Sequence, residues 1–99
     1  MAWWVVVTPA VVRGVRSFGF KDPTPDRILE SMERYLTHYG DVCATDRWSQ
    51  CPDDFFVYTH VLIEGGRWHT LEFIVNDASA AAMGVLKVIW VEDYPGDFL

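Results

Sequence analysis

The Gly65-Gly66 pair constrains the fold of this chain more than any other sequence feature. It separates two runs, 55–64 and 67–75, that are rich in β-branched and aromatic residues. A two-residue glycine link between such runs is typical of a β-hairpin, because the favoured turns need positive φ angles that glycine adopts without strain. The predicted cross-strand pairs are Glu64 with Arg67, Leu62 with His69, His60 with Leu71 and Tyr58 with Phe73.

This register also predicts which side chains share a face of the hairpin. One face carries Tyr58, His60 and His69, with the two histidines as diagonal neighbours. Histidine titrates near neutral pH, so such a pair beside a tyrosine is suited to acid–base work on a small ligand. The alternative is that both are half-buried sheet residues bonded to water or backbone. The other face carries Val57, Thr59, Val61, Ile63, Trp68, Thr70, Glu72 and Ile74.

Two helices are predicted before the hairpin. Thr8-Pro9 begins the first, with the threonine as cap and proline at the first helical position, and Gly19 ends it. Thr24-Pro25-Asp26 begins the second in the same way, and Gly40 ends it. Gly14 weakens the first helix by about 1 kcal/mol relative to alanine. The apolar stripes at helical spacing are Val11, Val12, Val15 and Phe18, then Ile28, Leu29, Met32, Tyr35, Leu36 and Tyr39.

The other segments complete a small sheet. They are a strand over 2–7, a long polar loop over 41–54, a turn with a short helical segment over 76–84 and a final strand over 85–93. The unbroken Val5–Val7 predicts burial on both faces of the first strand, and Pro95-Gly96 is expected to end the last one. The order β-α-α-β-β-β predicts one α+β domain over 1–99, with a helical hairpin packed on one face of a small, mainly antiparallel sheet.

The charge of the chain bears on the kind of partner that it can bind. Its 99 residues carry a formal net charge of −6, so direct nucleic-acid binding is not expected. Three of the eight bases and none of the 14 acids lie in residues 1–21. Either this is ordinary surface charge, or the acidic segment 92–99 folds over the basic one, or the basic segment meets an acidic partner. The longest apolar run, 2–7, is too short to span a bilayer and carries no signal-peptide pattern, so a cytoplasmic protein with no membrane segment is expected.

No metal site or cofactor is expected from the motifs. Cys43 and Cys51 are eight residues apart, with His38 upstream, and no C-x-x-C or H-x-x-x-H pair supports a zinc site. Free thiols are the favoured interpretation, with a disulfide across the loop and zinc binding as alternatives. The sequence also lacks a glycine-rich phosphate loop and a nucleophile elbow.

The tryptophans divide into two groups. Trp3, Trp4, Trp68 and Trp90 lie in predicted strands and are interpreted as core residues. Trp48 lies in the predicted polar loop, where a large aromatic side chain is a candidate anchor for a protein interface.

The chain resembles the RelE/ParE superfamily of bacterial toxins. The resemblance rests on the element order, on Trp4-Val5-Val6-Val7-Thr8-Pro9 running into a short helix, and on Leu71-Glu72-Phe73-Ile74-Val75-Asn76-Asp77 followed by Val85-Leu86-Lys87-Val88. It implies a strand, a helical hairpin and a three-stranded antiparallel meander. It also implies a toxin-type domain that binds a target and is neutralised by a partner antitoxin. The binding candidates are then Arg13, Arg16, Arg67, Lys87 and Tyr94.

The chain departs from the messenger-cleaving members of that superfamily. They carry a basic residue three positions before the strand aromatic, where this chain has Thr70 before Phe73. A basic residue or histidine usually follows their last strand, where this chain has Glu92-Asp93-Tyr94. Messenger cleavage is therefore not expected, whereas toxin-like binding of a target is compatible with the sequence.

A second functional class is also compatible with the sequence. An acidic, non-enzymatic interaction module, such as an inhibitor or immunity protein, presents carboxylates to a basic partner. If the helices cover one side of the sheet, the other exposes Val61, Ile63 and Trp68, a larger apolar patch than a monomer usually tolerates. Either the loop over 41–54 folds over this patch, with Trp48 as the plug, or another chain covers it. The many carboxylates of the loop resist burial, so we expect a homodimer or a bound protein partner.

Overall fold

The computed structural model of the protein describes residues 3–45 and 54–97. Its elements are β1 (Trp4–Val7), α1 (Pro9–Ser17), α2 (Thr24–Thr45), β2 (Phe55–Glu64), β3 (Arg67–Asn76), α3 (Ala80–Met83) and β4 (Val85–Asp97). This is the predicted order β-α-α-β-β-β with one short helix before the last strand. The α+β fold expected from the sequence is therefore confirmed.

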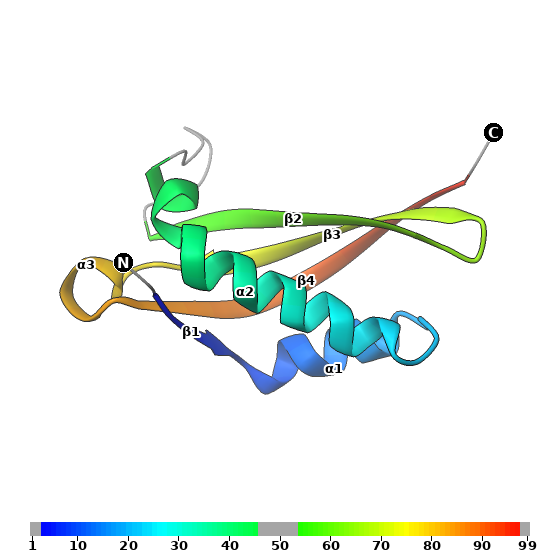
Figure 1. Ribbon diagram of the computed structural model, residues 1–99, viewed down its shortest axis with the longest axis horizontal. Helices are drawn as coiled ribbons and strands as arrows, with labels where there is room; N and C mark the ends of the chain where they lie inside the picture. Colours follow the sequence, from blue (N-terminus) through cyan, green and yellow to red (C-terminus); the bar gives the residue numbers. More distant parts are fainter. Residues whose placement is uncertain (1–2, 46–53, 98–99) are drawn as a thin grey trace.

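The strands form one curled sheet in the order β1-β4-β3-β2 (Figure 1). Neighbouring strands of β2, β3 and β4 run antiparallel, whereas β1 runs parallel to β4. Gly65 and Gly66 have φ angles of 62° and 75°, the positive values that a tight hairpin turn requires. All four predicted cross-strand pairs are present, from Glu64 with Arg67 to Tyr58 with Phe73.

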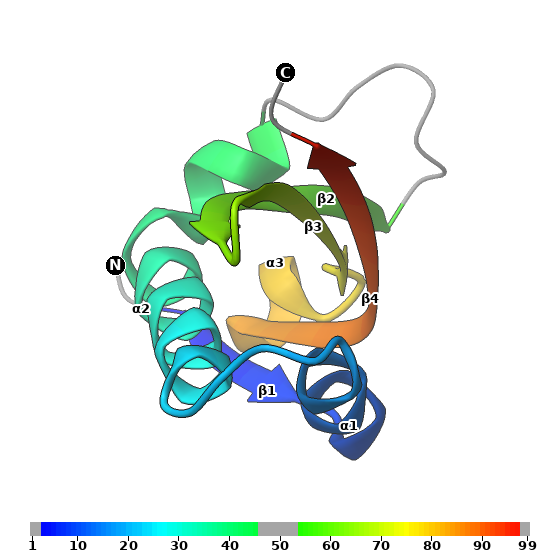
Figure 2. The same cartoon turned by 90° about the vertical axis from the view of Figure 1, so that its right-hand side faces the viewer.

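Helices α1 and α2 cover one face of this sheet (Figure 2). Helix α1 contacts β4, and α2 contacts both β2 and β1. Burial alternates along β3 with the period of two that one covered face dictates. The buried core consists of Val11, Val15, Phe20, Ile28, Met32, Leu36, Phe56, Leu71, Phe73, Val75, Leu86, Val88 and Val91. The predicted packing of both helices on the same side is confirmed.

Gly14 lies where helix α1 packs against strand β4. A Cβ atom at this position would lie 2.7 Å from Cγ1 of Val91 on β4, closer than two carbon atoms can approach. Helix α1 therefore lies as near to the sheet as a residue without a side chain allows. The tertiary contact compensates for the propensity that glycine lacks.

The predicted limits of α2 were wrong at its C-terminal end. The helix runs past Gly40 to Thr45, so part of the segment predicted as a loop is helical. Glycine lowers helix propensity but does not forbid helical φ and ψ angles, and the next proline is Pro52. Within residues 3–45 and 54–97, no helix is long and apolar enough to cross a membrane.

The predicted end of the last strand was also wrong. Strand β4 continues through Pro95 and Gly96 to Asp97, with Pro95 opposite His69 of β3. Strand β1 pairs with β4 only as far as Val88, so among the described residues the later part of β4 has a strand on one side only. Proline is tolerated there because its missing N–H falls at the edge of the sheet.

The burial expected for the tryptophans and for β1 was wrong as well. Trp4, Trp68 and Trp90 are 73%, 44% and 50% exposed, whereas Trp3 is partly buried against the core. Strand β1 alternates between exposed and half-buried residues and is not buried on both faces. The reason is the placement of both helices on one side of the sheet, so that among the described residues neither helix covers the second face.

Candidate functional site

The structure brings together the predicted face with Tyr58, His60 and His69, and this face lies toward the helices. The Tyr58 ring packs between two aromatic rings, with centroids 5.0 Å from Tyr35 and 6.0 Å from Phe73. The tyrosine therefore belongs to the packing of α2 on β2.

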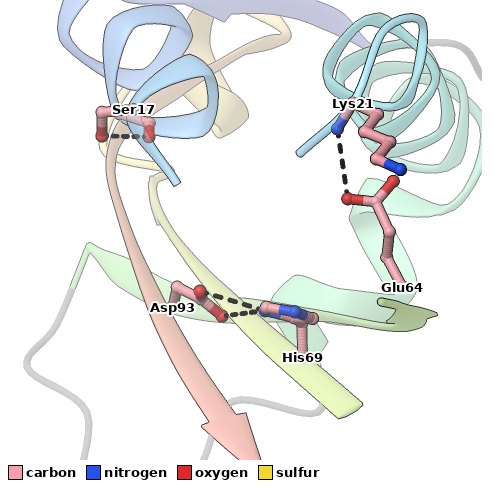
Figure 3. Close-up of polar contacts among 6 residues, drawn as sticks. Ser17, Lys21, Glu64, His69 and Asp93 are labelled. Carbon is pink, nitrogen blue, oxygen red and sulfur yellow. Dashed lines mark hydrogen bonds and ion pairs between the residues drawn. The ribbon is translucent and has the colours of Figure 1, made fainter. Parts of the chain in front are cut away.

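His69 is buried and has an acidic partner. Its Nδ1 atom lies 3.1 Å from both carboxylate oxygens of Asp93 on β4, and its ring packs edge-on against Phe20 at 4.8 Å between centroids. Figure 3 shows the two side chains pointing toward each other from adjacent strands. Asp93 is itself mostly buried, so the pair is largely shielded from solvent.

Asp93 is not among the predicted site residues, because the last strand was expected to end at that position. The signal was present in the alternation of β4. Val91 is buried on the helix-covered face, and a residue two positions later in a strand lies on the same face. That alternation puts Asp93 beside the core and within reach of His69.

His60 differs from His69 in its surroundings. It is half-buried on β2, and desolvation lowers its pKa below the ordinary value of 6.5. The neutral imidazole is therefore the form that the fold favours at this position. The two histidines are diagonal in register, as predicted, but His69 is held by Asp93 and Phe20.

Glu64 ties the tip of the hairpin to the segment between the two helices. Its carboxylate accepts a hydrogen bond from the backbone N–H of Lys21 at 3.2 Å and another from the Thr24 hydroxyl at 2.8 Å. Figure 3 shows the Glu64 carboxylate pointing toward Lys21. The Thr24 hydroxyl is thus used in a tertiary contact, and its predicted role as a helix cap was wrong.

The basic candidates do not gather at one place. Arg13 and Arg16 are exposed on α1, and Arg16 forms an exposed ion pair with Asp26 at 3.3 Å. Arg67 is opposite Glu64 at the hairpin turn. Lys87 is opposite Asn76 at the other end of β3, on the uncovered face. These side chains therefore form no single basic patch.

Three of the residues considered in the sequence fall wholly or partly outside the described part of the chain. Trp48 and Cys51 lie outside the described residues, as does the side chain of Cys43. Within residues 3–45 and 54–97, no cluster of three or more histidine, cysteine, aspartate or glutamate side chains could hold a metal ion.

The second face of the sheet is the most distinctive surface of the described chain, and we call it the open face. Its cross-strand register arranges β2, β3 and β4 in four rows. Three rows are largely apolar, and Val61, Ile63 and Tyr94 are each more than half exposed. The rows are Val57–Ile74–Trp90, Thr59–Glu72–Glu92, Val61–Thr70–Tyr94 and Ile63–Trp68–Gly96.

Beside these rows, β1 adds Trp4 and Val6 to the open face, opposite Val85 and Lys87 of β4. Both β1 residues are exposed, which extends the apolar character of the face to its far edge. Tyr94 is the one toxin-type binding candidate that lies among the apolar rows.

Comparison with known proteins assigns no relative to this chain. No protein family model, curated protein or solved structure matches it.

Proposed function

We propose that this domain binds another protein through the open face of its sheet. The observation that carries the proposal is the set of large apolar side chains exposed together on that face, including Val61, Ile63 and Trp90. Monomeric proteins rarely leave contiguous apolar patches of this kind uncovered, and such patches mark interaction sites. Aromatic residues, which the open face has in Trp68, Trp90 and Tyr94, are the side chains that most often anchor protein interfaces.

The charge of the open face supports a protein partner over a nucleic acid. Glu72 and Glu92 form the row at its centre, and carboxylates repel a phosphate backbone. The net charge of the whole chain, −6, acts in the same direction. The same two carboxylates disfavour a second copy of this chain as partner. A two-fold axis through the centre of the face would bring four carboxylates together.

The proposal can be tested by selecting random peptides displayed on phage for binding to the purified domain. We expect binders whose affinity falls about tenfold or more when Val61→Asp or Ile63→Asp places a charge on the open face. The matched control is Ser31→Asp on the exposed side of α2, which should leave affinity unchanged. Urea unfolding of each variant verifies that it is folded.

Two results would overturn the proposal. One is a set of binders that Val61→Asp and Ile63→Asp do not affect. The other is a wild-type homodimer in sedimentation that these variants convert to monomer, because the occupant of the face would then be a second copy.

We infer a toxin-type role as the second candidate function. It is favoured by the succession of a strand, a helical hairpin and the antiparallel meander β2-β3-β4, the arrangement that the resemblance to RelE/ParE toxins implies. Growth arrest on induced expression in bacteria, relieved by Tyr94→Ala on the open face, would support it. Normal growth at a verified level of folded protein would exclude it.

Messenger cleavage is not part of either proposal. Arg67 and Lys87 occupy register positions on opposite faces of the sheet, so they do not form one basic site. Purified protein added to a ribosome-containing extract should leave messenger RNA intact. Degradation that Arg67→Ala or Lys87→Ala abolishes would contradict this expectation.

A further inference from the structure

The centre of the open face carries two like charges side by side. Glu72 of β3 and Glu92 of β4 are directly opposite in register. Directly opposite residues have Cβ atoms about 5 Å apart, and like charges at such positions destabilise a sheet. Thr59 is the neighbour of Glu72 on the other side and brings no positive charge.

No basic side chain compensates the two carboxylates from the four rows of the open face. The other described side chains in those rows are apolar, aromatic or threonine. Lys87 lies on the same face but five residues before Glu92, roughly 16 Å along the strand. The polar contact that the structure gives Glu92 is a hydrogen bond from the indole Nε1–H of Trp90, at 2.7 Å.

Two exposed aromatic rings flank this pair. Trp90 and Tyr94 lie two residues before and after Glu92, on the same face and about 7 Å from it along the strand. They are 50% and 54% exposed. Aromatic faces attract cations, and paired carboxylates accept the parallel N–H donors of a guanidinium group.

We propose that the protein partner inserts an arginine side chain between Trp90 and Tyr94, against Glu72 and Glu92. This inference rests on the proposed function, because it names the chemistry of the partner at the same face. Arginine is favoured over lysine since its planar group can stack on one of the two rings while it donates to both carboxylates. The partner covers Val61, Ile63 and Trp68 with apolar side chains around that arginine.

The test uses a synthetic peptide of alternating valine and arginine, roughly ten residues long, and the same peptide with neutral citrulline replacing arginine. Binding is followed by the NMR signal of the Trp90 indole N–H. We expect the arginine peptide to bind about tenfold or more tightly than the citrulline peptide. Its affinity should also fall as the salt concentration rises from about 50 to about 300 mM.

A matched pair of variants separates this site from general attraction to an acidic protein. Glu72→Gln/Glu92→Gln and Glu30→Gln/Glu33→Gln remove the same charge, the latter from the exposed side of α2. The first variant should lose the preference for arginine over citrulline, and the second should keep it. Urea unfolding of both variants establishes that they are folded.

The arginine site would be overturned if both double variants lost the preference for the arginine peptide equally. It would also be overturned if Glu72→Gln/Glu92→Gln kept that preference. Failure of the arginine site can be distinguished from failure of the proposed protein binding at the open face. Phage-selected binders that depend on Val61 but contain no functional arginine would leave the binding face intact and remove only this inference.

Discussion

Replacing Gly14 by alanine should destabilise the protein, although the same change in an isolated helix would stabilise it. Alanine gains about 1 kcal/mol of helix propensity over glycine. In the fold, the added Cβ would lie 2.7 Å from Cγ1 of Val91, and carbon atoms in contact are about 3.5–4.0 Å apart. Forcing an extra carbon into a packed core costs typically 1–3 kcal/mol, so we expect a net loss of up to about 2 kcal/mol.

The effect of Gly14→Ala on the free energy of unfolding should change sign when the Val91 side chain is shortened. Val91→Ala alone should cost about 2 kcal/mol, from two buried carbons at about 0.8 kcal/mol each plus the cavity that they leave. In that background the Cβ of Gly14→Ala has room, so the substitution should raise stability by about 1 kcal/mol. The double-mutant cycle isolates the contact between α1 and β4.

Urea unfolding followed by tryptophan fluorescence measures the four free energies of the cycle. If Gly14→Ala stabilises the wild-type protein and the Val91→Ala variant equally, the two positions are not in contact. The placement of α1 on β4 would then be refuted.

Three further changes test other parts of the structure. Met32→Ala should lower the free energy of unfolding by about 2–5 kcal/mol because the side chain is fully buried, and a urea series showing a loss below about 1 kcal/mol would place this side of α2 outside the core. Glu72→Gln should raise it by a few tenths to about 1 kcal/mol by removing the repulsion from Glu92, whereas a loss in the same series would mean that the carboxylate stabilises the fold. His60→Gln should make stability less sensitive to acid. Burial lowers the folded-state pKa of His60 below 6.5, so the unfolded chain takes up the proton first and stability falls as pH drops through and below 6.5. Identical pH profiles of melting temperature for the variant and the wild type would contradict this.

The parts of the fold that were predictable depend on local geometry. Gly65-Gly66 imposes a turn with positive φ angles, and that turn fixes every pair in the hairpin. The stripe through Ile28, Met32 and Leu36 identifies the buried side of α2 for a similar reason, since helical spacing places those residues on one side. Neither feature requires knowledge of the rest of the chain.

The parts that were missed depend on which strand lies beside which. A proline ends a strand where a neighbouring strand needs its N–H, but on the β1 side β4 has no described strand beyond Val88. Exposure of Trp90 follows from the side on which the helices pack, which the composition of β4 does not reveal. The contact between His69 and Asp93 was not predicted, because the two residues are distant in sequence. They become neighbours only when β3 and β4 pair.

The most direct test of the binding face is an NMR titration of the isotopically labelled domain with a phage-selected peptide. We predict that the largest shifts of backbone amides fall on the central strands, in 57–63, 68–74 and 90–94, and that those of α1 and α2 stay nearly unchanged. Shifts concentrated on the helices, with the strand amides unaffected, would contradict the proposal that the open face of the sheet is the protein-binding surface.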